Sequence, residues 1–198
     1  MSLDNVTLRA ATLDDLAGIA AIYNQLWCNT LRNHGDVEAA DFCARFNIAM
    51  QLQRSPIALV AEAEGRIIAA CCIGIFEDGK PRTNPTWEAC YNEMLAQATE
   101  MAKAADAKLE GSLFGDSREK ATADRFAATG NEYAQGQLNL IIIVPEWQGK
   151  GLGRALIDLA RAELAKEGCT KFFLMSDCNS DWQFYEHLNM KRILEDHS

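Results

Sequence analysis

The stretch of sequence that decides the fold runs from Ile141 to Arg154 and reads Ile-Ile-Ile-Val-Pro-Glu-Trp-Gln-Gly-Lys-Gly-Leu-Gly-Arg. It predicts a buried strand, a tight glycine-rich turn and the start of a helix. Glycines let backbone N–H groups converge on an anion, and a helix N-terminus adds unpaired donors and the positive end of its dipole. Together with the charges of Lys150 and Arg154, the pattern favours a phosphate or pyrophosphate site.

The spacing of the three glycines narrows the kind of site. Gly149, Gly151 and Gly153 fit neither the Walker A loop, which ends in Gly-Lys-Ser/Thr, nor the dinucleotide fingerprint Gly-x-Gly-x-x-Gly. No acidic residue suited to a ribose follows a second strand, so a generic nucleotide-binding domain is a remote alternative. A turn selected only for tight packing is the remaining alternative.

At this point the chain resembles the GCN5-related N-acetyltransferase (GNAT) superfamily. The family's acyl-CoA motif, Gln/Arg-x-x-Gly-x-Gly/Ala, matches residues 148–153, and the segment from Phe184 to Lys191 is similar to the family's Phe-Tyr-Glu-x-Leu-Gly-Phe segment. The resemblance covers most of the chain outside residues 77–135. It implies an α/β (α+β) fold, with a mixed, twisted central sheet flanked by helices. It also implies one acyltransferase domain over residues 1–198, with a helical insertion at 77–135 between the third and fourth strands.

The resemblance further implies acetyl-CoA as co-substrate and an amine, small-molecule or peptide, as acceptor. Pantetheine would lie where the strand at 138–144 separates from the strand at 171–175, and the amides from Gln148 to Gly153 would hold the pyrophosphate. Tyr185 would lie near the sulfur and protonate the leaving thiolate, a role that suits an ordinary tyrosine pKa near ~10. The alternative for Tyr185 is packing on the sheet. The residues expected to bind CoA are Ile142, Ile143, Val144, Gln148, Gly149, Lys150, Gly151, Leu152, Gly153, Arg154 and Asn179.

Asn179 stands nearest to the family's asparagine that contacts the pantetheine arm at the start of the last helix. Its spacing to Tyr185 is not the commonest one, so Asp181 could align in its place. An asparagine here also fits an ordinary cap or turn position.

The general base is where this sequence departs from the family. Many relatives carry a glutamate on the strand before the motif, but the equivalent positions here are Gln137 and Asn139, and an amide cannot take a proton. Glu132, Asp177 or a carboxylate of the insertion could serve, or none if the amine arrives neutral. The loss also supports a second function, a non-catalytic acyl-CoA sensor or interaction module.

Composition excludes several other classes of protein. Nineteen Lys and Arg against 28 Asp and Glu give a formal charge of −9, which argues against nucleic-acid binding. No apolar run approaches the ~20 residues of a membrane span, and residues 1–10 do not resemble a signal peptide. The seven cysteines show no Cys-x-x-Cys spacing, so we expect free thiols, no metal site and a cytoplasmic location.

The insertion is polar and helical in character. A helix is expected to begin at Pro85, capped by Asn84, with an apolar stripe from Trp87 to Ala105, and a shorter helix should cover residues 117–128. We expect the insertion to cover the acceptor side, because long connections in compact domains tend to be functional. Its acids that could attract or deprotonate an amine are Glu110, Asp116 and Glu119.

The two ends of the chain give further expectations. Residues 29–36 are polar and predict a loop, and residues 190–194 predict a last short strand. Relatives usually carry one more strand after this point. Without it the sheet has an edge that needs covering, by the insertion or by a partner subunit, so a homodimer is a candidate.

Overall fold

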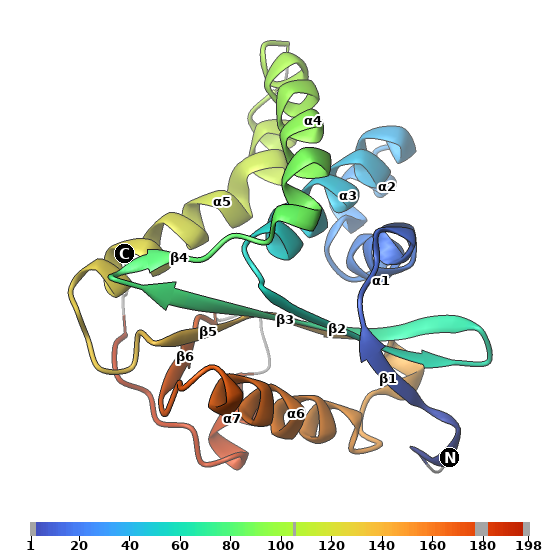
Figure 1. Ribbon diagram of the computed structural model, residues 1–198. Helices are drawn as coiled ribbons and strands as arrows, with labels where there is room; N and C mark the ends of the chain where they lie inside the picture. Colours follow the sequence, from blue (N-terminus) through green and yellow to red (C-terminus); the bar gives the residue numbers. More distant parts are fainter. Residues whose placement is uncertain (1–2, 105, 177–181, 196–198) are drawn as a thin grey trace.

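A single mixed sheet organises the molecule, and helices cover both of its faces (Figure 1). The computed structural model describes residues 3–104, 106–176 and 182–195. The strands are β1 (Thr7–Ala10), β2 (Ile57–Ala63), β3 (Arg66–Glu77), β4 (Lys80–Pro81), β5 (Gly136–Ile143) and β6 (Phe172–Leu174). The helices are α1 (Leu16–Trp27), α2 (Asn29–Asn33), α3 (Val37–Gln53), α4 (Pro85–Ala102), α5 (Ala107–Ala128), α6 (Leu152–Lys166) and α7 (Trp182–His187).

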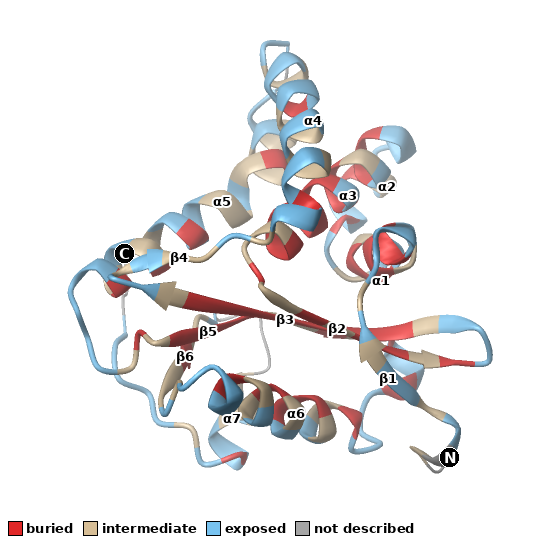
Figure 2. Cartoon of the chain, in the orientation of Figure 1, coloured by how far each residue is buried: buried red, intermediate tan, exposed pale blue. Residues whose placement is uncertain are grey.

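The strand order is β1-β2-β3-β5-β6, with β4 paired to β3. All neighbours are antiparallel except β5 and β6, which run parallel because α6 connects them. The central strands are buried on both faces, as Figure 2 shows, so they read as nearly continuous apolar runs. The α/β fold expected from the sequence, with an insertion between the third and fourth strands, is confirmed.

The tight turn between β2 and β3 follows from its sequence. Glu64 and Gly65 both have positive φ, 54° and 71°, which matches the twist that a two-residue hairpin requires. The register then places Ala63 opposite Arg66. Asp78 and Gly79 repeat this conformation, with φ values of 50° and 74°, and they turn the chain from β3 into β4. The insertion therefore begins with a short hairpin and not with a helix.

The helices divide between the two faces of the sheet. In Figure 1, α1, α3 and the paired α4 and α5 lie on one side, and α6 and α7 lie on the other. The far end of the α4–α5 pair projects away from the sheet and is largely exposed (Figure 2). The side of the pair that faces α3 is buried. Trp87, in the first turn of α4, and Leu113, in the first half of α5, are 1% and 0% exposed and belong to the main core. The apolar stripe of α4 therefore packs on the body of the protein.

Four expectations about secondary structure need correction. α5 begins at Ala107 and not at Ser117, because Asp106 caps it by accepting the N–H groups of Lys108 and Leu109 at 3.1 and 2.8 Å. Residues 29–33, expected as loop, form the short helix α2. α4 ends at Ala102, before the expected limit of its stripe. Residues 190–194 form no strand.

Two interruptions coincide in the middle of β5. Cys72 lies opposite Leu140, whereas Ile73 lies opposite Leu138, so Asn139 is the extra residue of a β-bulge. Pairing between β5 and β6 ends at Leu138, one residue before the bulge. Among the described residues, the β5 edge that faces away from β3 therefore has no strand partner from Asn139 to Ile143. This opening is where the family resemblance predicts pantetheine.

Candidate functional site

The glycine turn after β5 has the backbone geometry of an anion-binding loop. Gly149 and Gly151 have φ values of 69° and 85°, which side chains other than glycine adopt only with strain. No heavy atom lies within 4 Å of the position that a Cβ would occupy at either glycine, so the space above the turn is open. Gly151 is the N-cap of α6, and it brings no side chain that could satisfy the first amides of the helix.

The backbone N–H groups of this turn are available to bind an anion. Within the described part of the chain, no acceptor is found for the backbone N–H groups of residues 149–154. Hydrogen bonding in α6 starts with Ala155, whose N–H donates to the Gly151 carbonyl at 3.1 Å. The N–H of Gln148 differs, because it donates to the Pro145 carbonyl at 3.2 Å. A row of free donors at a helix N-terminus suits a pyrophosphate.

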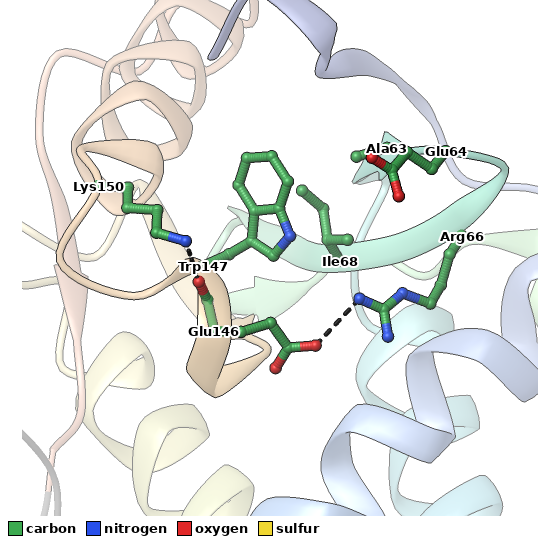
Figure 3. A pocket seen from close by; sticks show the side chains of 7 residues that line it. All are labelled: Ala63, Glu64, Arg66, Ile68, Glu146, Trp147 and Lys150. Atoms are coloured by element: carbon green, nitrogen blue, oxygen red, sulfur yellow. Dashed lines mark hydrogen bonds and ion pairs between the residues drawn. The ribbon is translucent and has the colours of Figure 1, made fainter. Parts of the chain in front are cut away.

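Two cations flank the turn in different ways. Arg154 is exposed and forms no ion pair with any described residue. Lys150 donates from Nζ to the Glu146 carbonyl, and its Nζ lies 5.3 Å from the centre of the Trp147 ring (Figure 3). Gln148 turns its side chain back, and its Nε2 donates to the Ile143 carbonyl at 3.0 Å. The first residue of the motif thus fixes the turn to the end of β5.

A hollow of about 200 Å³ lies beside this turn, at the tip of the β2–β3 hairpin. Figure 3 shows Arg66 reaching across it to Glu146, with 3.0 Å between Nη2 and Oε1. The Glu146 backbone N–H and the Arg66 guanidinium lower the pKa of this carboxyl. The lining is Ala63, Glu64, Arg66, Ile68, Glu146, Trp147 and Lys150. Arg66 and Glu146 pair with each other across the hollow, and Lys150 donates to a backbone carbonyl, so we place no ligand in it.

Phe184, the neighbour of Tyr185 in α7, lies against the first turn of α6. A Cβ built on Gly153 would lie 3.0 Å from Cζ of Phe184, so α7 packs directly on the first turn of α6. The rings of Phe184 and Tyr185 meet edge to face, with 5.2 Å between their centres. The Tyr185 carbonyl accepts the N–H groups of Leu188 and Met190, which ends the helix. Asn179, Asp181 and Asp177 lie outside the described residues.

The two amides at the expected base positions are buried in different ways. Asn139 donates from Nδ2 to the Arg54 carbonyl at 3.1 Å and to the Ser55 Oγ at 2.9 Å. These two bonds fix the orientation of the amide, so its Oδ1 points away from Arg54 and Ser55. Gln137 is 1% exposed, and neither atom of its amide has a partner among the described residues. Glu132 is exposed and paired with Lys171, whose pKa it raises. None of these three is an evident base.

The insertion brings one carboxylate against α1 and α3. Tyr23 donates from its hydroxyl to Asp116 Oδ2 at 2.9 Å, and Gln51 donates from Nε2 to the same oxygen at 3.4 Å. Burial and the neighbouring Asp116 raise the pKa of Tyr23 above its ordinary value, so the phenol keeps its proton. Asp116 is half-buried and pairs with no described cation. Glu110, in contrast, is exposed and faces Arg118 at 3.9 Å.

The sequence did not identify Lys120 or Tyr23. Lys120 is 2% exposed, and it occupies the core-facing row of α5 together with Leu113, Ala123 and Ala127. The helical spacing of these four residues could have indicated the burial of Lys120, but a lysine inside a polar helix is normally expected to be solvated.

Burial raises the pKa of the thiols of Cys28 to about 11 and of Cys43 to about 12, which makes them poor nucleophiles.

Residues 19–190 match the model of the acetyltransferase (GNAT) family. The chain belongs to this family. A search of curated protein sequences found no match. In the described residues of this GNAT protein, no helix is long and apolar enough to cross a membrane, and no group of three or more His, Cys, Asp or Glu could hold a metal ion.

Solved structures show the same fold at low sequence identity. A GCN5-related N-acetyltransferase from Ralstonia eutropha JMP134 is 14% identical, with a TM-score of 0.53 over 98% of this chain and 97% of the other. A ribosomal-protein-alanine N-acetyltransferase from Brucella melitensis biovar Abortus 2308 is 14% identical, with a TM-score of 0.50 over 98% and 96%. A GNAT acetyltransferase from Brucella melitensis in complex with acetyl-CoA is 14% identical, with a TM-score of 0.50 over 94% and 83%.

Proposed function

We propose that this GNAT protein is an acetyl-CoA-dependent N-acetyltransferase that moves the acetyl group to a primary amine. The observation that carries the proposal is the row of amides at residues 149–154, which lies next to the edge of β5 beyond Leu138. Neither the amides nor this edge has a backbone partner among the residues that the structure describes. A long anionic cofactor needs both features, because the amides suit its pyrophosphate and a strand edge suits its amide-containing arm. A structure of a family member with acetyl-CoA supports this choice of donor.

In this proposal the cofactor contacts divide by chemistry. The edge of β5 at Ile142 and Ile143, with Val144 directly after the strand, runs beside the pantetheine arm, and the amides of the turn hold the pyrophosphate. Arg154, which has no described ion-pair partner, adds charge. Gln148 acts through its side-chain hydrogen bond to Ile143, since its own N–H is already used.

The reaction is a direct transfer. The amine nitrogen attacks the thioester carbonyl carbon, forming the C–N bond and placing negative charge on the carbonyl oxygen. The C–S bond then breaks, the CoA sulfur takes a proton from the Tyr185 hydroxyl, and the proton lost by the nitrogen restores the tyrosine. The position of α7 on the first turn of α6 supports this role, because Tyr185 is then carried by the element next to the turn.

We assign the acceptor side to the face where the insertion meets α1 and α3. Asp116 receives two neutral donors and no described cation, so it can still attract an ammonium group. It lies one helical turn from Lys120, which contacts the bulge of β5. Asp116 is also the insertion carboxylate that we propose as base. It takes the first proton from the arriving ammonium group, and the second proton, lost when the neutral amine attacks, restores Tyr185. Gln137 and Asn139 cannot take a proton.

The second candidate function is an acyl-CoA sensor without catalysis. It is favoured by the same two amides, which replace the acidic residue of many relatives. The two candidate functions predict different results in an activity assay, because only the acetyltransferase turns over acetyl-CoA. Purified protein incubated with acetyl-CoA and a panel of amines should release free thiol above the rate without amine. Heat stabilisation by acetyl-CoA without any thiol release over the whole panel would favour the sensor instead.

A further inference from the structure

The burial of Lys120 is energetically unfavourable unless its charge has a partner. It lies on α5 inside the insertion and is 2% exposed, although an ammonium group loses much of its hydration free energy when it is buried. At a position that only fills space, methionine or leucine packs without that cost. A specific hydrogen-bond acceptor must therefore offset the cost of burying this ammonium group.

The acceptor is the bulge of β5. Lys120 Nζ donates to the carbonyl of Asn139 at 3.1 Å, and it lies 3.4 Å from Oε1 of Glu119, which is 45% exposed. Asn139 is the extra residue of the bulge, directly after the last residue of β5 that pairs with β6. Its side chain is held from the other direction by Arg54 and Ser55 at the end of α3. The point where the two strands separate is thus fixed by two helices.

The ammonium also lies close to the strand that pairs with this point. Cys72 is opposite Leu140, the first residue after the bulge. Burial raises the pKa of the Cys72 thiol to about 12, and the charge of Lys120 acts on it in the opposite direction. The charge of Lys120 therefore also acts on the strand that faces the start of the segment 140–143.

We propose that Lys120 is a positioning residue that fixes the backbone of β5 beyond the bulge, at residues 140–143. By holding the Asn139 carbonyl, it sets the direction in which the following peptide groups point. Taken with the proposed function, on which this consequence rests, the insertion supports the donor thioester as well as facing the acceptor. The helix that approaches the amine would then also set the geometry of the strand that carries acetyl-CoA.

The test compares Lys120→Met with Lys103→Met in ligand-free protein. Both variants remove one positive charge from the insertion, but Lys103 is exposed at the end of α4. We expect amide hydrogen exchange at residues 140–143 to be at least ~10-fold faster in Lys120→Met, since the opening of this segment becomes easier. The melting temperature should not fall, because an apolar side chain replaces a buried charge. Lys120→Arg, which keeps a donor, should exchange at nearly the wild-type rate.

Two results would overturn the proposal. One is unchanged exchange at residues 140–143 in Lys120→Met. The other is faster exchange throughout β2, β3 and β5 together with a lower melting temperature, which would make Lys120 a packing residue.

Binding data connect Lys120 to the donor. In our proposal a backbone N–H of residues 140–143 donates to the thioester carbonyl, which CoA lacks. The ratio of CoA to acetyl-CoA dissociation constants should therefore fall about fivefold in Lys120→Met, because this hydrogen bond is weakened. An unchanged ratio would overturn the link to the thioester. Failure of the wild type to bind either ligand would instead reject the proposed function, and the exchange data would still decide the role of Lys120.

Discussion

Phe184 lies so close to Gly153 that a β-carbon on the glycine would be 3.0 Å from the tip of the ring. The contact joins the first turn of α6, which offers its free amides, to the short helix that carries Tyr185. Gly153 is therefore glycine for a different reason from Gly149 and Gly151. It permits close packing, whereas they permit positive φ.

Replacing Gly153 by alanine should reveal this contact. Alanine favours the helix by up to ~1 kcal/mol, but overpacking against Phe184 costs about 1–3 kcal/mol, so Gly153→Ala should lower stability. In a Phe184→Leu background the same change should raise stability, because the ring atoms in contact are gone. Urea unfolding of the four proteins gives the coupling free energy, which should equal the overpacking cost of about 1–3 kcal/mol. Additive effects would show that the helices do not press on each other here.

The anion site can be tested at Gly151 with a matched control. Acetyl-CoA and CoA should raise the melting temperature of the wild type, and Gly151→Asp should abolish the rise by placing a carboxylate beside the pyrophosphate. Gly35 provides the control, since its φ is 83° and the space that a Cβ would occupy there is also open. Gly35→Asp carries the same strain and charge away from the turn, so it should keep the rise. An equal loss in both variants would reject the assignment.

Tyr185→Phe should affect chemistry and not binding. If the hydroxyl acts only as the C–S bond breaks, the turnover rate should fall about 100-fold, while the dissociation constant of acetyl-CoA stays within about twofold. Tyr133→Phe is a suitable control, because that ring lies under Lys171 in another part of the molecule. Stopped-flow measurement of free thiol would show whether chemistry limits the rate. Unchanged turnover with rate-limiting chemistry would leave Tyr185 a packing residue.

The acceptor assignment leads to a prediction at Asp116. Asp116→Asn should leave CoA binding unchanged, but it should raise the KM for the amine about tenfold, because a charge-assisted hydrogen bond is lost, and lower the turnover rate, because an amide takes no proton. Glu110→Gln on the exposed part of α5 should change neither quantity. A point substitution is preferable to deleting the insertion, because Trp87 and Leu113 of the insertion belong to the core and their loss would destabilise the fold. Equal KM values for the wild type and Asp116→Asn would place the acceptor elsewhere.

Acid stability should depend on Asp15. The Arg9 guanidinium and the Thr12 backbone and side chain lower the pKa of this carboxyl from 3.8 to about 2. A depressed pKa in the folded state stabilises the protein above the unfolded-state pKa, so this contribution is lost as pH falls from about 5 to 2. The contribution at neutral pH is about 2 kcal/mol, because one pKa unit corresponds to about 1.4 kcal/mol. Asp15→Asn should lower the free energy of unfolding at pH 7 and much less at pH 2, whereas exposed Asp14→Asn should not.

The sequence predicted those parts of the protein whose local signals agree with their packing. The apolar run of β5, the glycines of the turn and the apolar face of α6 each favour one structure, and the cap at Asn84 is found as expected, accepting the N–H of Thr86 at 3.1 Å. α5 was predicted ten residues too short at its start because Gly111 and Gly115 weaken the helix signal, although Asp106 offered a cap.

Other features arise only from tertiary contacts. The bulge at Asn139 depends on the register between two strands that are far apart in the sequence. The burial of Lys120 depends on how α5 crosses the sheet, and the meeting of Tyr23 with Asp116 needs α1 and α5 together. Periodicity and capping describe one element at a time, so they cannot reveal such pairings.

The pairing of Ile75 with Gly136 joins residues separated by the entire insertion. Closing so long a segment before any contact forms is entropically costly, and pairings of this kind slow folding. The hairpin at Asp78 and Gly79 can form from local contacts, but α4 and α5 pack mainly against α3. Arg82, just before α4, pairs with Glu167 at 2.8 Å. The pairing of β3 with β5 should therefore be a late event on the folding pathway. The β5 edge that we propose for the cofactor would form at the same late stage.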